Sequence, residues 1–428
     1  MIRFETDPAI ASKNASVSFL LFAIGALLCL VRVPALPMVA NGPEMVALAS
    51  NLVHKGFYGN PSPVLDTGPS AQNPPLYPFI LAFLMVSLKN PYAVTIAAVV
   101  GCVLTNSLIA AWLPRLSWLF FGDLRPGIIA AGLWLLSLNL MPGWDVSYTT
   151  ALLLFFCLFT AATIARENFA GAAIVAGLMG GALFLFNPAS MLVFSVWLLY
   201  LLAWSGKTAK QRLGYCGILL ATTSLVASSW MLRNELVLGG FVARTNFGMT
   251  FYASNNDCAQ PNLIDDLYSG CYTEHHPAGS VKEAKILVSM GEIKYDRARV
   301  HDTMAWIRSH PARFARLTVV RIFYFWFPAP DGPRFQAAVV WLATILSIPG
   351  LALMAHRKIR CTLFIVAVLL VYPLMYYVVM SSPRYRYPIL WLTLLPAGYF
   401  TQWLGILLAP GFRKMTSLRS WGRSEGLS

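Results

Sequence analysis

The chain has 428 residues, of which 57% are hydrophobic and only 12% are charged. Soluble domains average about half apolar and about a quarter charged residues, so this composition excludes an ordinary soluble protein. The net charge of +14 does not indicate a nucleic-acid partner, because most of this net charge comes from the short segments that flank the apolar runs and from the two termini. We therefore predict an all-α polytopic membrane protein that binds no nucleic acid.

Ten apolar runs are long enough to cross a hydrocarbon layer of about 30 Å, the shorter ones with help from their flanking residues. The first run follows a short segment that carries Arg3 and Lys13. No small-residue cleavage site follows it, so we expect a retained helix and not a signal peptide. The sequence thus predicts about ten transmembrane helices, at residues 17–34, 92–113, 127–141, 147–164, 170–186, 189–204, 213–231, 337–355, 362–380 and 389–408.

The distribution of basic residues predicts the sidedness of these helices. With a cytoplasmic N-terminus, every short cytoplasmic segment is net basic or balanced, as the positive-inside rule requires. Two long polar segments, residues 36–91 and 233–334, then lie outside the cytoplasm, and both termini lie inside it. We call residues 36–91 the first outer segment and residues 233–334 the second outer segment. Loops of this length usually have a function, and we expect both to belong to one domain of residues 1–428.

Three stretches of the outer segments predict helices at the membrane surface. Residues 76–88 and 314–327 are apolar but too short to span comfortably, and the second stretch carries Arg316 and Arg321. Helices that lie in the plane of the interface account for both. Residues 43–53 have apolar positions at helical spacing after a Gly-Pro start, which is typical of an amphipathic helix.

An ordered set of short motifs runs along nearly the whole chain. It comprises Glu44 at a helix start, GFYGNP, TGPSAQNPPLYP from Thr67, NPAS from Asn187, WMLRN from Trp230, GMTFYASNN from Gly248, GEIKYDRA through FYFWFP, and RYRYP from Arg384. This set resembles the GT-C class of polyprenyl-phosphate-sugar-dependent glycosyltransferases. It is most similar to the bacterial branch of dolichyl-phosphate-mannose-protein mannosyltransferase-like and aminoarabinose-transferase-like enzymes.

The resemblance implies a helical bundle in the inner (plasma) membrane whose outer segments, on the periplasmic side, roof a cavity. It implies transfer of a sugar from a polyprenyl-phosphate donor to a lipid, glycan or protein acceptor. The catalytic acid of the class lies early in the first outer loop, and Glu44 matches it best. Many relatives begin that motif with an aspartate where this chain has Asn41, which cannot act as a base. Either Glu44 carries the role or the chain lacks turnover. Participation of a divalent cation is left open.

Three carboxylates are candidates for the acid or base that such a transfer needs. Glu44 is the first, with Asp66 and Asp145 beside it. Each also has a structural interpretation. Glu44 suits the positive end of a helix dipole, Asp66 precedes a Thr-Gly-Pro turn, and Asp145 would be an ordinary N-cap. An acidic group that faces a cavity near the membrane is nevertheless a functional candidate.

Four residues are candidates for holding the donor phosphate. Arg384, Tyr385 and Arg386 are expected at the outer mouth of the last two spans, and Arg233 at the outer end of the seventh. Arginine can hold phosphate oxygens in a bidentate fork while tyrosines line the interface. Snorkelling and aromatic anchoring are the alternatives. A basic cluster on the outer side opposes the positive-inside trend, which favours binding.

The second outer segment contains the only two cysteines in polar sequence, Cys258 and Cys271. They lie on the side expected to be oxidising, so we predict a disulfide. His275 and His276 are adjacent, and in a strand they would point to opposite faces, which argues against a joint metal site.

Two other classes of function remain open. One is a lipid-sugar binding or assembly protein without turnover, and the other is a transporter of polyprenyl-linked glycans. Inverted repeats, expected of a transporter, are not evident. The cytoplasmic segments are too short for a nucleotide-binding domain, so the donor should be membrane-borne.

Overall fold

The computed structural model describes residues 8–32, 42–138, 144–204, 208–329 and 334–408. Within these ranges the regular elements are all helices, and β pairing is limited to two isolated bridges. Asn41 lies outside the described residues. The prediction of an all-α chain is therefore confirmed for the part of the chain that the structure describes.

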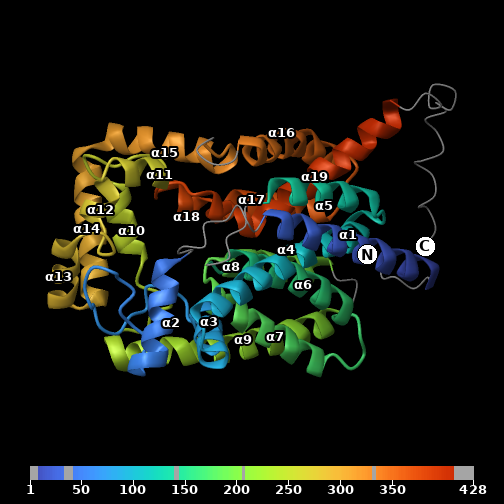
Figure 1. Cartoon of the computed structure of the whole chain (residues 1–428). Helices are drawn as coiled ribbons and strands as arrows, with labels where there is room; N and C mark the ends of the chain where they lie inside the picture. The colour runs from blue at the N-terminus through green and yellow to red at the C-terminus, as the bar shows by residue number, and fades with distance from the viewer. Residues whose placement is uncertain (1–7, 33–41, 139–143, 205–207, 330–333, 409–428) are drawn as a thin grey trace.

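The ten predicted spans all coincide with helices that run roughly side by side in one bundle (Figure 1). Six of these helices are long and apolar enough to cross a membrane, by length and composition. The remaining spans correspond to shorter helices, so the polytopic membrane bundle is confirmed. The bundle helices are α1 (Pro8–Arg32), α4 (Pro91–Phe121), α5 (Arg125–Ser137), α6 (Val146–Thr163), α7 (Ala170–Phe186), α8 (Ser190–Trp204), α9 (Ala209–Leu238), α16 (Arg334–His356), α17 (Cys361–Val371), α18 (Leu374–Tyr377) and α19 (Pro383–Leu408).

Large aromatic side chains fill the centre of the bundle. Trp134, Trp197 and Trp391 are fully buried, and each indole nitrogen has a partner. Trp197 Nε1 donates to Thr160 Oγ1 at 2.8 Å and Trp134 Nε1 donates to the Asn106 carbonyl at 3.2 Å. A buried indole usually finds a partner for its N–H, and these two contacts join α8 to α6 and α5 to α4.

The two outer segments gather at one end of the bundle (Figure 1). The first contains α2 (Pro43–Lys55) and α3 (Leu76–Leu88), which lie across the direction of the bundle helices. Their bounds confirm the helices predicted at 43–53 and 76–88. The second outer segment contains α10 (Phe247–Ser254), α11 (Leu263–Tyr268), α12 (Cys271–His275), α13 (Val281–Met290), α14 (Glu292–Ser309) and α15 (Pro311–Trp326).

The helix predicted at 314–327 forms as α15, which runs along the direction of α16 and not across it (Figure 1). Its Arg316 is exposed, but Arg321 is completely buried. Arg321 donates to the carbonyls of Ser254 and Val378 and to Asn255 Oδ1. These acceptors explain how an arginine is accommodated within an apolar helix. A position of α2, α3 or α15 at the membrane surface stays a prediction.

Candidate functional site

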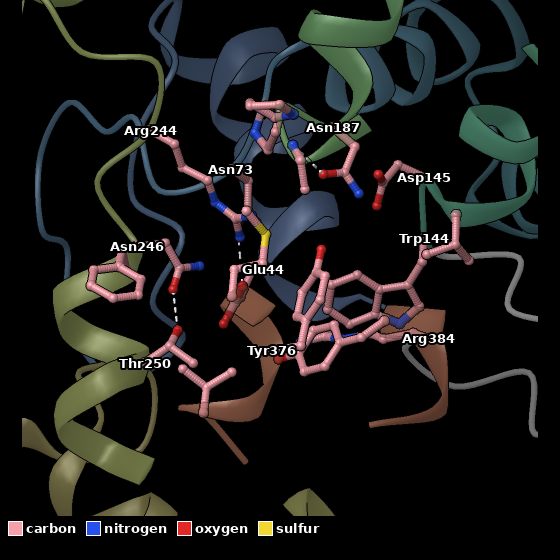
Figure 2. A pocket seen from close by; sticks show the side chains of 18 of the residues that line it. Glu44, Asn73, Trp144, Asp145, Asn187, Arg244, Asn246, Thr250, Tyr376 and Arg384 are labelled. Atoms are coloured by element: carbon pink, nitrogen blue, oxygen red, sulfur yellow. Dashed lines mark hydrogen bonds between the residues drawn. The ribbon is translucent and has the colours of Figure 1, made fainter. Parts of the chain in front are cut away.

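A cavity of about 340 Å³ lies where the two outer segments meet the ends of the bundle helices (Figure 2). Residues from both outer segments and from the starts of α6, α8 and α19 line it. Four of the seven predicted site residues belong to this lining, namely Glu44, Asp145, Arg384 and Tyr385. Residues that are far apart in the sequence are therefore brought together at one site.

Glu44 is positioned by the start of α2. The helix begins after Gly42, whose φ of 70° favours glycine, and Pro43 occupies the first turn. Met45 then packs with Tyr77 and Leu81 of α3, which fixes the rotation of α2. Asn73 Nδ2 donates to Glu44 Oε2 at 3.2 Å. No other hydrogen bond to the carboxylate comes from the described residues, so Glu44 is available to a ligand.

Asp145 occupies the N-cap position of α6, but its side chain caps no backbone amide. Its Oδ2 accepts a hydrogen bond from Thr149 Oγ1 at 3.3 Å, and the residue is 7% exposed. Burial raises the pKa of Asp145, while the nearby charges of Arg244 and Arg384 lower it. The carboxylate thus faces the cavity and the two guanidinium groups, and does not serve the helix terminus.

Arg384 lies in the first turn of α19, against aromatic rings. Its guanidinium carbon is 4.1 Å from the centroid of the Trp144 ring and 5.2 Å from that of Tyr385. Tyr385 in turn stacks on Tyr376 with ring centroids 4.5 Å apart. Stacking occupies the face of the guanidinium and leaves its N–H edge for an anion. The predicted pair Arg384 and Tyr385 therefore shares one wall of the cavity.

Arg244 is a cavity residue that the sequence analysis missed. Its Nε donates to the Gln72 carbonyl at 2.6 Å, which anchors the side chain to the first outer segment. In Figure 2 the guanidinium extends towards Glu44, from the side of the cavity opposite Asp145 and Arg384. The signal used for Arg384, a basic residue expected outside the cytoplasm beside a motif of the resembled class, applies equally to Arg244.

Asp66, Arg233 and Arg386 do not line this cavity. Asp66 is exposed and pairs with Lys55 at 2.9 Å. Arg233 donates to the carbonyls of Ser70 and Tyr58 at 2.9 and 2.8 Å, so it holds the connector between α2 and α3. The roles predicted for these three residues gain no support from the geometry.

Arg386 is buried between bundle helices, at 3% exposure. It donates to the Trp326 carbonyl and, at 2.8 Å, to Thr344 Oγ1. These contacts join α19 to the end of α15 and to α16. The guanidinium of Arg386 therefore binds groups inside the bundle, whereas that of Arg384, two residues earlier, lies at the cavity.

Glu292 joins the two outer segments behind the cavity. Its Oε1 accepts hydrogen bonds from Ala71 N at 2.6 Å and from Thr245 Oγ1, while Thr245 N donates to the Ala71 carbonyl at 3.1 Å. Burial raises the pKa of Glu292. The connector that carries Asn73 and the stretch before α10 that carries Arg244 are therefore held together.

Cys258 and Cys271 form the predicted disulfide, with sulfurs 2.05 Å apart. The bridge ties the chain after α10 to the first residue of α12. His275 lies beside it, with Nδ1 3.8 Å from each sulfur. These three residues have the proximity of a metal site, but sulfurs bonded to each other are not thiolate ligands. His276, by contrast, lines the cavity, so the adjacent histidines do point to different surroundings.

The fold and the cavity define a polytopic helical membrane protein with an acidic and basic site at one end of its bundle. No protein-family model and no curated protein matches the sequence. Solved structures do match, and they include crystal structures of the oligosaccharyltransferase of Archaeoglobus fulgidus.

The apo form of that enzyme aligns over 93% of this chain and 51% of its own, with a TM-score of 0.56 and 14% identity. The complex with Zn and sulfate gives a TM-score of 0.52 at 11% identity, over 91% of this chain and 49% of that one. The form tethered to an acceptor peptide containing the NVT sequon gives 0.51 at 11% identity, over 90% and 49%. The chain spans about half the length of these structures, and at such identities the likeness concerns the fold alone.

Proposed function

We propose that this chain is a glycosyltransferase that moves a sugar from a polyprenyl-phosphate-linked donor to an acceptor hydroxyl at the outer face of the membrane. The observation that carries the proposal is the convergence of Glu44, Asp145, Arg244 and Arg384 on one cavity. A fold similar to that of an archaeal oligosaccharyltransferase supports it. The resemblance of the motifs to the mannosyltransferase-like and aminoarabinose-transferase-like branch favours donors with a single phosphate.

In this proposal Glu44 is the general base. It accepts the proton of the acceptor hydroxyl while the acceptor oxygen bonds to the anomeric carbon of the sugar. The bond between that carbon and the phosphate oxygen breaks, and polyprenyl phosphate leaves with the electron pair. Asn73 donates to Glu44 and keeps its carboxylate directed at the acceptor.

Arg384 holds the departing phosphate, and Arg244, which extends towards Glu44 from the opposite side, adds a second positive charge to the cavity. Guanidinium groups stabilise the negative charge that develops on the leaving oxygen, and they do so more strongly inside a cavity than in water. Asp145 shares the cavity with both arginines and interacts with their charges, and it is the second candidate for the base. Both carboxylates and both arginines are then used in one reaction.

Release of free polyprenyl phosphate tests this function. Purified protein in lipid receives a panel of polyprenyl-phosphate hexoses and pentoses with an envelope lipid extract as acceptor. We expect wild type and Asp66→Asn to release polyprenyl phosphate, because Asp66 lies outside the cavity, and Glu44→Gln to lose at least a hundredfold in rate. Equal turnover by Glu44→Gln would remove Glu44 as the base.

The same experiment separates the alternatives. Wild-type protein that binds the donors yet releases nothing would be a lipid-sugar binding or assembly protein. Movement of intact donor across the membrane without release would indicate a transporter. Either result would contradict the transferase function.

A further inference from the structure

Two stacked aromatic side chains line the cavity, one from α12 and one from the residue that follows this helix. Neither has a role in the transfer step proposed above. The rings of Tyr272 and His276 are nearly parallel, at 12°, with centroids 4.6 Å apart. His276 is 3% exposed, and both residues belong to the cavity wall. The Cys258–Cys271 disulfide fixes the residue directly before Tyr272. This pair therefore presents a fixed surface to whatever the cavity holds.

The hydrogen bonds of His276 define its tautomer. Its Nδ1 accepts from the backbone N–H of Ala278 at 3.1 Å, so the proton of the neutral ring lies on Nε2. Burial lowers the pKa of His276 and favours that neutral ring. Nε2 has no hydrogen-bond partner among the residues that the structure describes. Since His276 lines the cavity, this donor is available to a ligand or to water that accepts the hydrogen bond.

The surroundings of the pair indicate which part of a ligand it contacts. Tyr272 and His276 both lie within electrostatic range of Glu44 and Arg384. In the proposed reaction Glu44 marks the acceptor oxygen and Arg384 marks the phosphate. The transferred sugar must lie between these two points. A neutral N–H donor beside a flat ring suits a sugar hydroxyl and the apolar face of a pyranose or furanose ring.

We infer that Tyr272 and His276 form the subsite for the transferred sugar, with His276 Nε2 donating a hydrogen bond to a hydroxyl and Tyr272 packing against the sugar ring. This inference rests on the proposed function and names the part of its substrate that each residue recognises. Both are positioning residues, because neither exchanges a proton or a bond in the reaction. They are expected to determine which sugar is accepted.

A pair of His276 variants separates this role from a structural one. Asparagine places an acceptor near the position of Nδ1 and keeps the bond from Ala278, but it has no donor at the position of Nε2. Glutamine places its amide donor near Nε2. The readout is binding to purified protein in lipid, measured for polyprenyl phosphate and for a panel of polyprenyl-phosphate hexoses and pentoses.

We expect wild type to bind at least one glycosylated lipid about tenfold more tightly than polyprenyl phosphate, the equivalent of one hydrogen bond with its packing. His276→Asn should abolish that preference and leave the affinity for polyprenyl phosphate unchanged. His276→Gln should recover part of it. Tyr272→Leu should reduce the preference, and Tyr272→Phe should keep it.

Other outcomes are equally informative. His276→Asn could keep the full preference for glycosylated lipid, or it could lose affinity equally for glycosylated lipid and for polyprenyl phosphate. Either result would overturn the sugar subsite while the transferase function stands. A wild-type protein that binds none of the lipids would overturn the proposed function itself, and the subsite with it. An unfolding temperature of His276→Asn equal to that of the wild type confirms that the variant is folded.

Discussion

Asp266 is a residue whose burial has a measurable consequence. It is completely buried in α11, and Gln260 N donates to its Oδ1 at 2.7 Å, but its Oδ2 has no hydrogen-bond partner among the described residues. Burial is the main cause that raises its pKa from 3.8 to about 6, against the opposing charges of Arg321 and His275. The folded protein therefore binds the proton of Asp266 more tightly than the unfolded chain does.

The sign of the effect on stability follows from this shift. Because the folded state binds the proton more tightly than the unfolded state, the contribution of Asp266 to stability falls as the pH rises from about 4 to about 6. We expect Asp266→Asn to remove this dependence and to raise the free energy of unfolding at pH 7 by up to about 3 kcal/mol. Thermal unfolding in detergent across pH 4 to 8 measures it.

The neighbouring Asp265 is exposed and supplies the control. Asp265→Asn should retain the pH dependence of the wild type. Parallel pH profiles for wild type and Asp266→Asn would contradict the assignment of the effect to Asp266.

Among the elements, α10 and α14 show how a single glycine sets the position of a cavity wall. A Cβ on Gly248 would lie 1.9 Å from the Asp296 carbonyl oxygen. Only glycine permits this approach, and Met249 N then donates to Asp296 Oδ1 at 3.2 Å. The close approach places Asn246, Phe247 and Thr250 at the cavity.

We expect Gly248→Ala to force α10 away from α14 and to cost about 1 to 3 kcal/mol. It should also weaken binding of polyprenyl-phosphate sugars, because the cavity wall moves. Gly217→Ala in α9 is the matched control, since no atom lies within 4 Å of the added Cβ. Unfolding temperature and lipid affinity are the two measurements, and a Gly248→Ala protein that matches Gly217→Ala in both would refute the argument.

The short helix α12 depends on its disulfide more than on its own propensity, because five residues are too few for a stable isolated helix. The disulfide closes a loop between residues that are 13 apart in the sequence. Closing such a loop contributes about 3 kcal/mol to the free energy of unfolding. The double variant Cys258→Ser, Cys271→Ser should therefore lose the preference for glycosylated lipid over polyprenyl phosphate. Affinity for polyprenyl phosphate should stay, because Arg384 lies on a different element. Loss of both affinities would show instead that the whole second outer segment had unfolded.

At the scale of the molecule, the sidedness of the bundle can be tested with single cysteines. The five free cysteines are all buried, so the wild type should not react with an impermeant maleimide. Asp66 in the first outer segment and Glu167 between α6 and α7 are both exposed. In sealed right-side-out vesicles we expect labelling of Asp66→Cys at once and of Glu167→Cys only after permeabilisation. The reverse pattern would place the cavity in the cytoplasm.

The sequence determined the architecture of this protein because hydrophobicity is a local property. A run of about 20 apolar residues is recognisable without knowledge of its neighbours, and the ten predicted spans all fall on helices. The helices at 76–88 and 314–327 were predictable from shorter apolar runs, and the helix at 43–53 from apolar positions at helical spacing, which are also local patterns. The disulfide was predictable because only Cys258 and Cys271 lie in polar sequence. The short helices α10 to α14 carry no comparable signal, and packing between them decides their positions.

The tertiary structure decided which charged residues meet. In sequence Arg384 and Arg386 are equivalent, yet one stacks on Trp144 at the cavity and the other is held by Trp326 and Thr344 inside the bundle. The different positions of these two side chains depend on partners that are at least 40 residues away in the sequence. Arg244 and His276 joined the site for the same reason, since their neighbours Gln72 and Glu44 lie in the other outer segment. Contacts between distant segments are absent from any local pattern, so the cavity and its chemistry emerged only from the fold.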